Sequence, residues 1–309
     1  MNFPENNAQA LDSLRWYAQM GVDLCVEDVP QKLVSRVQSP ESSEGGTTRI
    51  ASPLAGEATR LNERSEFSRS GEGALNPSTS LSSPLTQPSP ARGEGSAAAP
   101  LSPPASIASA IAEARALADA ANDLTQLEAA VRGFTGCSLK KTATNTVFAG
   151  GVAQSRLMFI GDAPGAEEDR AGVPFSGPSG QLLDTMLGFI GLNRAEHFYI
   201  TNTLFWRPPG NRQPTKDELA ICLPLVEKHI ALVNPKLLVL VGGTATASVL
   251  GDARGITRLR GQVFRYTNAY MAAEIPVHVL YHPSYLLRQP LAKKQAWADI
   301  LKLKATLAQ

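Results

Sequence analysis

The sequence predicts an α/β fold: a three-layer αβα arrangement around a central four-stranded parallel sheet, preceded by a disordered linker and an N-terminal helix. Two observations predict this fold. Four apolar runs of strand length recur in the second half of the chain, and stretches of helical character separate them. The runs are nearly continuous rather than alternating, which is typical of strands buried on both faces. We expect one strand within each of the apolar runs 156–161, 197–206, 236–243 and 276–284, and helices at 179–190, 215–233, 244–250 and 291–307.

Composition divides the chain into three parts. Residues 1–35 are predicted to form an N-terminal helical segment, because 10–34 carries a short, partly helical pattern of apolar residues with a turn at Gly21. Residues 36–104 are rich in Ser, Pro, Gly and Ala, so they cannot bury enough apolar surface to offset the entropy of ordering. We predict a disordered linker there, with a regulatory tail as the alternative. Residues 105–309 are predicted to form the α/β domain, which begins with alanine-rich helical sequence.

The bulk composition narrows the functional classes. A formal net charge of +1 gives no overall attraction for nucleic acid, so any such surface must be local. No stretch approaches the roughly 18 to 20 consecutive apolar residues of a membrane span. The first residues lack the basic-then-apolar pattern of a secretory signal. Three scattered cysteines are too few for a disulfide framework. We therefore expect a soluble protein of a reducing compartment with no membrane partner.

Polar side chains follow three of the four predicted strands. Asp162, Asn202 and His282 lie at or just after the ends of the first, second and fourth strands. Because the carboxyl ends of parallel strands meet at one edge, where ligands bind in such folds, we expect these three side chains to converge. Phe175, in the loop after the first strand, adds an aromatic face. An amide, an aromatic ring and an imidazole together suit a nucleobase turned out of its stack.

Each of these residues also has a structural alternative. Asp162 could cap a turn, which is the commonest role of Asp in a loop rich in Gly and Pro. Asn202 could satisfy buried backbone groups, His282 could be a core histidine, and Phe175 could be ordinary core. The glycine-rich segment 242–248 lacks the lysine of a phosphate-binding loop, so it favours helix packing over nucleotide binding.

Several longer motifs agree with one family. The segments "GDAPGAEEDRAGVPFSGPSGQLLD", "YITNTLFWRPPGNRQPTKDELAICLPLVEKHI", "NPKLLVLVGGTA", "GITRLRG" and "HPSYLLR" resemble the family-four branch of the uracil-DNA glycosylase superfamily. The resemblance covers about residues 134 to 307. It implies base excision repair: hydrolysis of the bond between uracil and deoxyribose in DNA, single- or double-stranded, leaving an abasic site. It also implies a monomer in the cytoplasm, associated with the nucleoid.

The resemblance implies roles for the residues at the strand ends. Asp162 would orient or activate the attacking water, at a position where the family usually has Glu. Phe175 would stack on the extruded uracil, and Asn202 would recognise its N3–H and O4 edge. His282 would stabilise negative charge on the departing base. The expected substrate-binding set is completed by Gly161, Ala163 and Gly165.

The resemblance also implies contacts to the DNA backbone. Ser179 and Gly180 of the "PSG" motif, together with Ser284, would contact phosphates. Leu286 with Leu287 would wedge into the base stack. The segment 254–265 carries four arginines and no acidic residue. We expect further phosphate contacts from three of these arginines and from one after the last strand, namely Arg254, Arg258, Arg260 and Arg288.

The family's iron–sulfur cluster is held by four cysteines, and two of these positions differ here. Phe134 and Trp206 stand at two of them, which leaves only Cys137 and Cys222. Because aromatic side chains cannot ligate iron, we predict that the protein has no metal or cofactor. Three alternatives to uracil excision stay open: a related glycosylase for hypoxanthine or mismatched thymine, a catalytically weak protein that binds uracil-containing or abasic DNA, and a nucleotide-binding domain.

Overall fold

The computed structural model describes residues 13–21 and 107–308. The predicted linker, 36–104, lies outside the described residues, as does most of the predicted N-terminal segment. Within 13–21, residues 13–19 form a helix. None of the helices in the described part of the chain is long and apolar enough to cross a membrane.

One mixed sheet of six strands organises the domain, in the order β1-β3-β2-β4-β6-β5. Its four inner strands, β3, β2, β4 and β6, pair in parallel, which confirms the predicted α/β class and parallel core. Two antiparallel edge strands, β1 and β5, were not expected. The bounds are β1 Gly150–Gly151, β2 Leu157–Gly161, β3 Tyr199–Asn202, β4 Leu237–Val241, β5 Val263–Tyr266 and β6 Ile275–Leu280.

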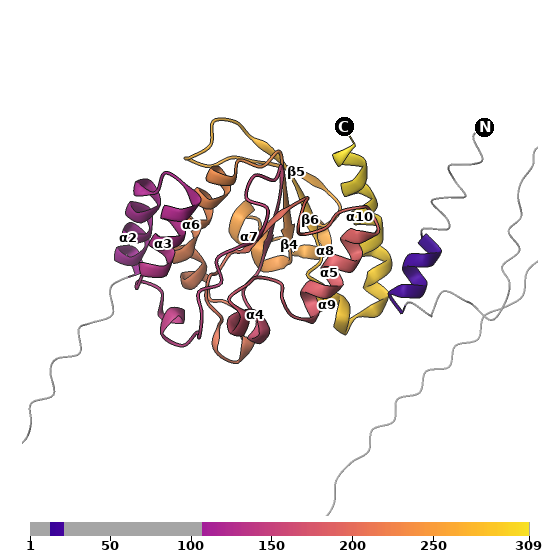
Figure 1. Cartoon of the computed structure of the whole chain (residues 1–309), viewed down its shortest axis with the longest axis horizontal. Helices are drawn as coiled ribbons and strands as arrows, with labels where there is room; N and C mark the ends of the chain where they lie inside the picture. Colours follow the sequence, from indigo (N-terminus) through magenta and orange to yellow (C-terminus); the bar gives the residue numbers. More distant parts are fainter. Residues whose placement is uncertain (1–12, 22–106, 309) are drawn as a thin grey trace, which may run out of the picture. The chain divides into compact units, whose positions relative to one another are not determined.

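The inner strands are buried on both faces, as their apolar runs predict. In β2, Met158 and Ile160 belong to one apolar cluster, whereas Leu157 and Phe159 belong to another on the opposite face. The alternation follows from the two-residue period of a strand. Helices cover the two faces and produce the three layers seen in Figure 1.

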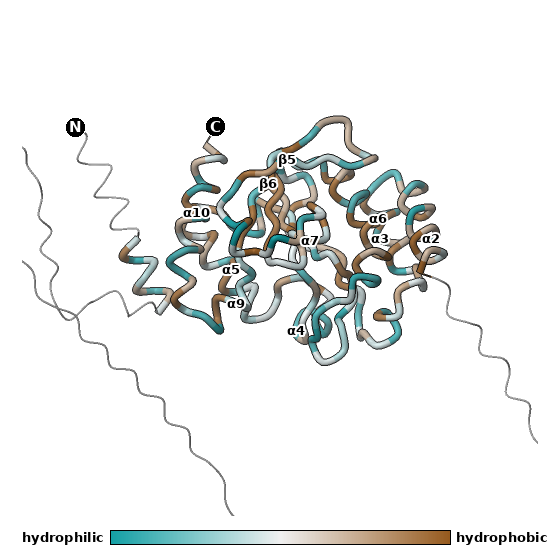
Figure 2. Tube along the Cα trace, turned by 180° about the vertical axis from the view of Figure 1, so that it is seen from behind, coloured by the Kyte–Doolittle hydropathy of each residue, from teal (hydrophilic) through white to brown (hydrophobic). Residues whose placement is uncertain are grey.

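Two sets of helices cover the sheet (Figure 1). The first set contributes to the cluster around Met158: it comprises α6 Lys216–Val233 and α7 Gly243–Leu250, with α2 Ile107–Ala120 and α3 Leu124–Gly133 packed on α6. The second set covers the other face and comprises α5 Pro178–Gly188 and α10 Lys293–Leu307. The helices show hydrophobic and hydrophilic residues in alternation along their turns (Figure 2), as expected for helices with one buried side.

Short elements join these layers, and local residues explain several of their boundaries. They are η2 Ser138–Lys141, α4 Ala166–Ala171, η3 Pro209–Asn211, α8 Ile256–Leu259, α9 Pro283–Arg288 and η4 Pro290–Ala292. The longest helix of the described residues, α6, begins at a capping box in which Thr215 and Glu218 satisfy each other's backbone N–H groups. It ends at Asn234, whose φ of 49° is left-handed.

The N-terminal helix packs against the domain through a pair of indole rings. Trp16 is wholly buried and stacks on Trp297 of α10, with ring centroids 5.1 Å apart. Trp297 Nε1 donates to Ser13 Oγ at 3.1 Å, and Lys293 Nζ donates to the carbonyl oxygen of Met20. Residues 13–21 therefore contribute to the same apolar cluster as α9 and α10.

Candidate functional site

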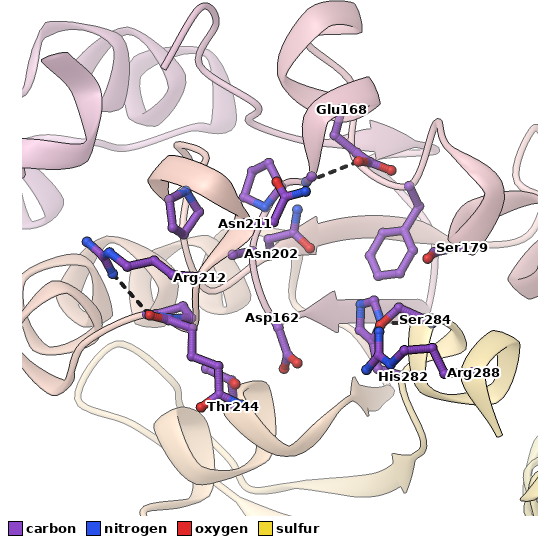
Figure 3. A pocket seen from close by; sticks show the side chains of 17 residues that line it. Asp162, Glu168, Ser179, Asn202, Asn211, Arg212, Thr244, His282, Ser284 and Arg288 are labelled. Carbon is purple, nitrogen blue, oxygen red and sulfur yellow. Dashed lines mark hydrogen bonds between the residues drawn. The ribbon is translucent and has the colours of Figure 1, made fainter. Parts of the chain in front are cut away.

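The carboxyl edge of the parallel sheet carries a cavity of about 370 Å³ (Figure 3). Parallel pairing sets Gly161 of β2 opposite Asn202 of β3, so Asp162 follows directly beside that amide. His282 comes just after β6 and begins α9. The cavity is lined by Asp162, Ala163, Pro164, Gly165, Glu168, Phe175, Ser179, Asn202, Pro208, Asn211, Arg212, Gln213, Pro214, Thr244, His282, Ser284 and Arg288.

Asp162 joins the cavity to the start of α7. Its Oδ1 accepts a hydrogen bond from the backbone N–H of Ala245 at 2.7 Å. Gly242 allows this close approach, because a Cβ there would lie 2.6 Å from the Asp162 carboxylate oxygens. Burial raises the pKa of Asp162 to about 6, although hydrogen bonds from Ala245 and Thr244 oppose the shift. The carboxylate therefore both lines the cavity and caps a neighbouring helix.

Asn202 presents an uncommitted amide. The residue is 2% exposed, yet no hydrogen bond among the described residues involves the oxygen or nitrogen of its side-chain amide. The neighbouring Thr203 satisfies two backbone carbonyl groups instead: its N–H donates to the Gly161 oxygen at 2.9 Å, and its hydroxyl donates to the Asp162 oxygen. Because a buried amide without partners is costly, its donors and acceptor are available to a ligand in the cavity.

Phe175 is held in a backbone conformation that few residues other than glycine adopt. Its φ is 54°, in the left-handed region, which costs roughly 1–2 kcal/mol for a side chain with a Cβ. Its ring lies against the His282 imidazole, with centroids 5.6 Å apart and planes at 30°. Two glycines make room: a Cβ at Gly161 would overlap the Phe175 ring, and one at Gly180 would overlap its carbonyl.

His282 is neutral, and its hydrogen bonds assign its tautomer. Nδ1 accepts from the backbone N–H of Ser284 at 3.2 Å and lies 2.8 Å from Ser284 Oγ. Because a backbone N–H can only donate, Nδ1 carries the lone pair and the single ring proton is on Nε2. Burial lowers the pKa of His282 to about 4, opposed by the charge of Glu168 and assisted by that of Arg288. The imidazole can therefore donate from Nε2 at neutral pH.

The sequence did not single out several lining residues. Glu168 accepts from the backbone N–H groups of Gly165 and Gly177, both at 3.0 Å, and so ties two parts of the loop together. Its position three residues after Gly165, at the start of α4, was the available signal. Arg212 pairs with Glu218 at 2.5 Å and lowers the pKa of that carboxyl through its hydrogen bond. The loop at 207–214 belongs to one of the motifs that carry the resemblance, but no role was predicted for its residues.

The other predicted site residues divide into two groups. Ala163, Gly165, Ser179, Ser284 and Arg288 line the cavity with the strand-end residues. Leu286 is wholly buried in the cluster with Trp16, whereas the neighbouring Leu287 is 46% exposed.

The arginines of the segment 254–260 lie away from the cavity lining. Arg254 pairs with Asp252 on the surface. Arg260 binds the buried Asp299 of α10 at 2.7 Å and lies over the Tyr281 ring. Arg258 is exposed. Of the four predicted phosphate-binding arginines, Arg288 is therefore the one at the cavity.

Comparisons with known proteins identify relatives over most of the domain. A family model described as the uracil DNA glycosylase superfamily matches residues 148–301. A type-4 uracil-DNA glycosylase of Thermotoga maritima is 38% identical over 159 residues, covering 51% of this chain and 80% of that protein. Those of Sulfurisphaera tokodaii and Archaeoglobus fulgidus are each 34% identical, covering 59% and 54% of this chain and 84% of each relative.

These relatives contradict the prediction that the protein has no cofactor. They are type-4 enzymes, and the resemblance implies an iron–sulfur cluster held by four cysteines for that branch. Cys137 and Cys222 are buried free thiols, and Phe134 lies 6.3 Å from Trp206 between ring centroids. Within residues 13–21 and 107–308, no group of three or more His, Cys, Asp or Glu side chains could hold a metal. The described residues therefore do not form a four-cysteine site. The relatives nevertheless overturn the prediction of a cofactor-free protein.

The tautomer of His282 can be tested by NMR titration. In protein labelled with ¹⁵N at histidine, Nδ1 of His282 should show the shift of an unprotonated nitrogen and Nε2 that of a protonated one. The ring should stay neutral from pH 7 down to about 4, because burial disfavours the cation. A midpoint near 6.5, or a proton on Nδ1 at pH 7, would contradict this assignment.

Proposed function

The chain belongs to the uracil-DNA glycosylase superfamily, and we propose that it extrudes uracil from DNA into this cavity and hydrolyses its N-glycosidic bond. The observation that carries the proposal is the uncommitted amide of Asn202, which lies with the Phe175 ring and the Nε2–H of His282 around one cavity. Several relatives named type-4 uracil-DNA glycosylases support it.

Base recognition would use the amide and the ring together. The Asn202 oxygen would accept from uracil N3–H while its nitrogen donates to O4, which matches the edge of uracil. The flat face of the base would stack on Phe175, whose ring lines the same cavity as that amide. Because the amide is buried, a base that cannot pair with it would leave polar groups unsatisfied, and the site would discriminate against that base.

Bond cleavage builds negative charge on uracil and positive charge on the sugar. His282 would donate from Nε2 to uracil O2, where the negative charge develops. A preorganised donor of this kind is typically worth about 3 to 4 kcal/mol in the transition state. Because Ser284 already fixes the ring through Nδ1, no reorientation is needed when the bond breaks.

Asp162 would act on the other side of the reaction. With a pKa of about 6, its carboxyl is largely ionised at neutral pH, so it can favour the cationic sugar and orient the attacking water. A positioned base contributes roughly 10² to 10⁴ in rate. The hydrogen bond from the Ala245 N–H fixes one carboxylate oxygen of Asp162, but that oxygen is then less available to a water molecule. That reduced availability favours, as a second candidate, a catalytically weak protein that binds uracil-containing or abasic DNA.

The DNA backbone would pass over the same edge of the sheet. Ser179 would contact a phosphate beside the extruded nucleotide, and Arg288 would neutralise it. The backbone N–H and hydroxyl of Ser284 already face His282 Nδ1, so the phosphate role expected for Ser284 is not proposed. Leu287 is the exposed member of the expected wedge pair, so we assign to it the space vacated by the base. Base extrusion costs a few kcal/mol, and these contacts with the stacking on Phe175 would offset it.

Release of uracil from defined oligonucleotides tests the proposed reaction. Wild-type protein should produce alkali-labile sites from DNA containing uracil, but not from otherwise identical DNA containing hypoxanthine or a G·T pair. Asn202→Ala, His282→Ala and Asp162→Asn should each lower kcat by about 10²-fold or more, since each removes a group from the reacting base or sugar. Arg170→Ala, on an exposed ion pair of α4, is the matched control.

The outcomes of this assay separate the candidates. Binding of uracil-containing DNA without cleavage would favour the weak binding protein. Cleavage at hypoxanthine or mismatched thymine instead of uracil would favour the related specificity. A near-full rate in any of the three variants would remove the role assigned to that residue.

The phosphate contact of Arg288 predicts a change in salt dependence. Neutralising one phosphate ligand should reduce the slope of log K against log salt by about one. We expect this for Arg288→Ala, measured by fluorescence anisotropy with DNA carrying a non-cleavable uracil analogue. Arg254→Ala should leave the slope unchanged, because its guanidinium is bound to Asp252 away from the cavity. Equal slopes for wild type and Arg288→Ala would contradict the placement.

A further inference from the structure

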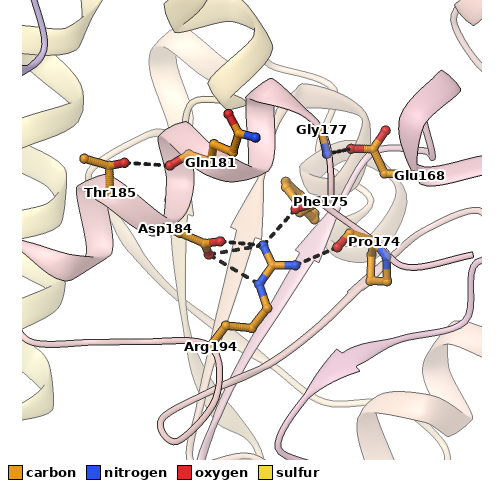
Figure 4. Close-up of polar contacts among 8 residues, drawn as sticks. All are labelled: Glu168, Pro174, Phe175, Gly177, Gln181, Asp184, Thr185 and Arg194. Carbon is orange, nitrogen blue, oxygen red and sulfur yellow. Dashed lines mark hydrogen bonds and ion pairs between the residues drawn. The ribbon is translucent and has the colours of Figure 1, made fainter. Parts of the chain in front are cut away.

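One arginine binds the backbone carbonyl groups on both sides of the strained Phe175 Cα (Figure 4). Arg194 lies between α5 and β3 and is not among the residues that line the cavity. Its Nη1 donates to the carbonyl oxygen of Pro174 at 2.8 Å, and its Nη2 donates to that of Phe175 at 2.9 Å. One guanidinium therefore fixes two consecutive carbonyl groups.

The guanidinium is itself held in place. Asp184 of α5 accepts from Arg194 Nη2 through both carboxylate oxygens, each at 3.1 Å, and from Nε at 3.3 Å. The Arg194 side chain is only 20% exposed. A planar fork of donors can satisfy a carboxylate and two carbonyls at once, whereas a lysine ammonium offers a single point charge. The pair thus links a rigid helix to the turn at 174–177.

The turn is restrained from two further sides. Gly180 packs so closely on the carbonyl of Phe175 that no side chain fits there. Glu168 accepts from the N–H of Gly177 at 3.0 Å (Figure 4). All these contacts reach backbone atoms around a residue whose φ of 54° is unfavourable. A strained conformation of this kind persists only where its surroundings enforce it.

We propose that Arg194 is a positioning residue, which holds the Phe175 turn in its left-handed conformation and thereby keeps the ring preorganised as the stacking surface for the base. The inference rests on the proposed function. Without the guanidinium, the carbonyls of Pro174 and Phe175 lose their partners, the backbone relaxes to negative φ, and the ring leaves the cavity wall. Arg194 itself touches neither DNA nor the reacting atoms; it acts through Phe175.

A double-mutant cycle tests this dependence. We would measure kcat/KM on uracil-containing oligonucleotide, and the inhibition constant of free uracil, for wild type, Arg194→Ala, Phe175→Ala and the double variant. Arg194→Ala should lower kcat/KM by about 10- to 100-fold, as expected when a binding group is misplaced by about 1 Å. It should also weaken inhibition by uracil about tenfold. In the Phe175→Ala background the same substitution should change either quantity by less than about threefold.

Two further variants complete the experiment. Arg194→Lys keeps the charge and long stem of the side chain, and should still lose at least about fivefold in kcat/KM because it cannot hold both carbonyls and Asp184. It serves in place of Arg194→Ala if that protein does not fold. Arg170→Ala should match wild type within twofold, since its ion pair is exposed. Urea unfolding confirms that every protein assayed is folded.

The outcomes are distinguishable. The inference is supported if Arg194→Ala lowers kcat/KM and weakens inhibition by uracil in the wild-type background, but has little further effect in the Phe175→Ala background. An active wild type with an unaffected Arg194→Ala, or with losses that multiply fully in the double variant, overturns it and leaves the proposed function standing. A folded wild type that releases no uracil overturns the proposed function, and this inference with it.

Discussion

The parallel pairing of β2 with β3 and β4 is the constraint on which the cavity depends. Asp162 and Asn202 are 40 residues apart in sequence, and the register that places Gly161 opposite Asn202 brings them together. The chain passes from β2 to β3 on one side and then crosses back to β4 on the other side of β2, so the strand order reverses beside β2. That reversal opens a crevice at the carboxyl edge of the sheet. The start of α7 fills one side of this crevice, and the Asp162 carboxylate binds it.

Burial then gives each polar group its chemical character. His282 is neutral because the cation would be poorly solvated, and Ser284 leaves its proton on Nε2. The same desolvation raises the pKa of Asp162 and leaves the Asn202 amide without a partner among the described residues. Hydrogen bonds formed in such a site are stronger than those in water. The Asn202 amide and the Nε2–H of His282 therefore offer hydrogen-bonding groups that a planar base with alternating donors and acceptors would satisfy.

The sequence predicted the strand ends well because buried parallel strands leave continuous apolar runs. It missed the edge strand β5, two of whose four residues are exposed and which overlaps the segment interpreted as basic. It also missed contacts formed by backbone atoms. Arg194 binds two backbone carbonyl groups, and nothing in the neighbouring sequence indicates these partners. Long-range ion pairs are hidden for the same reason: Arg260 meets Asp299 across 39 residues. The burial of Leu286 beneath the N-terminal helix depends on packing that no local pattern carries.

A crystal structure of the wild-type protein with uracil would test the central claim most directly, namely that the strand ends and the Phe175 turn form a ready-made site for one base. The account predicts uracil stacked on Phe175, its N3–H and O4 paired with Asn202, and its O2 within about 3 Å of His282 Nε2. Phe175 should keep its positive φ when uracil is bound. Uracil bound elsewhere, or in this cavity with Asn202 unpaired and the Phe175 turn rearranged, would contradict the account.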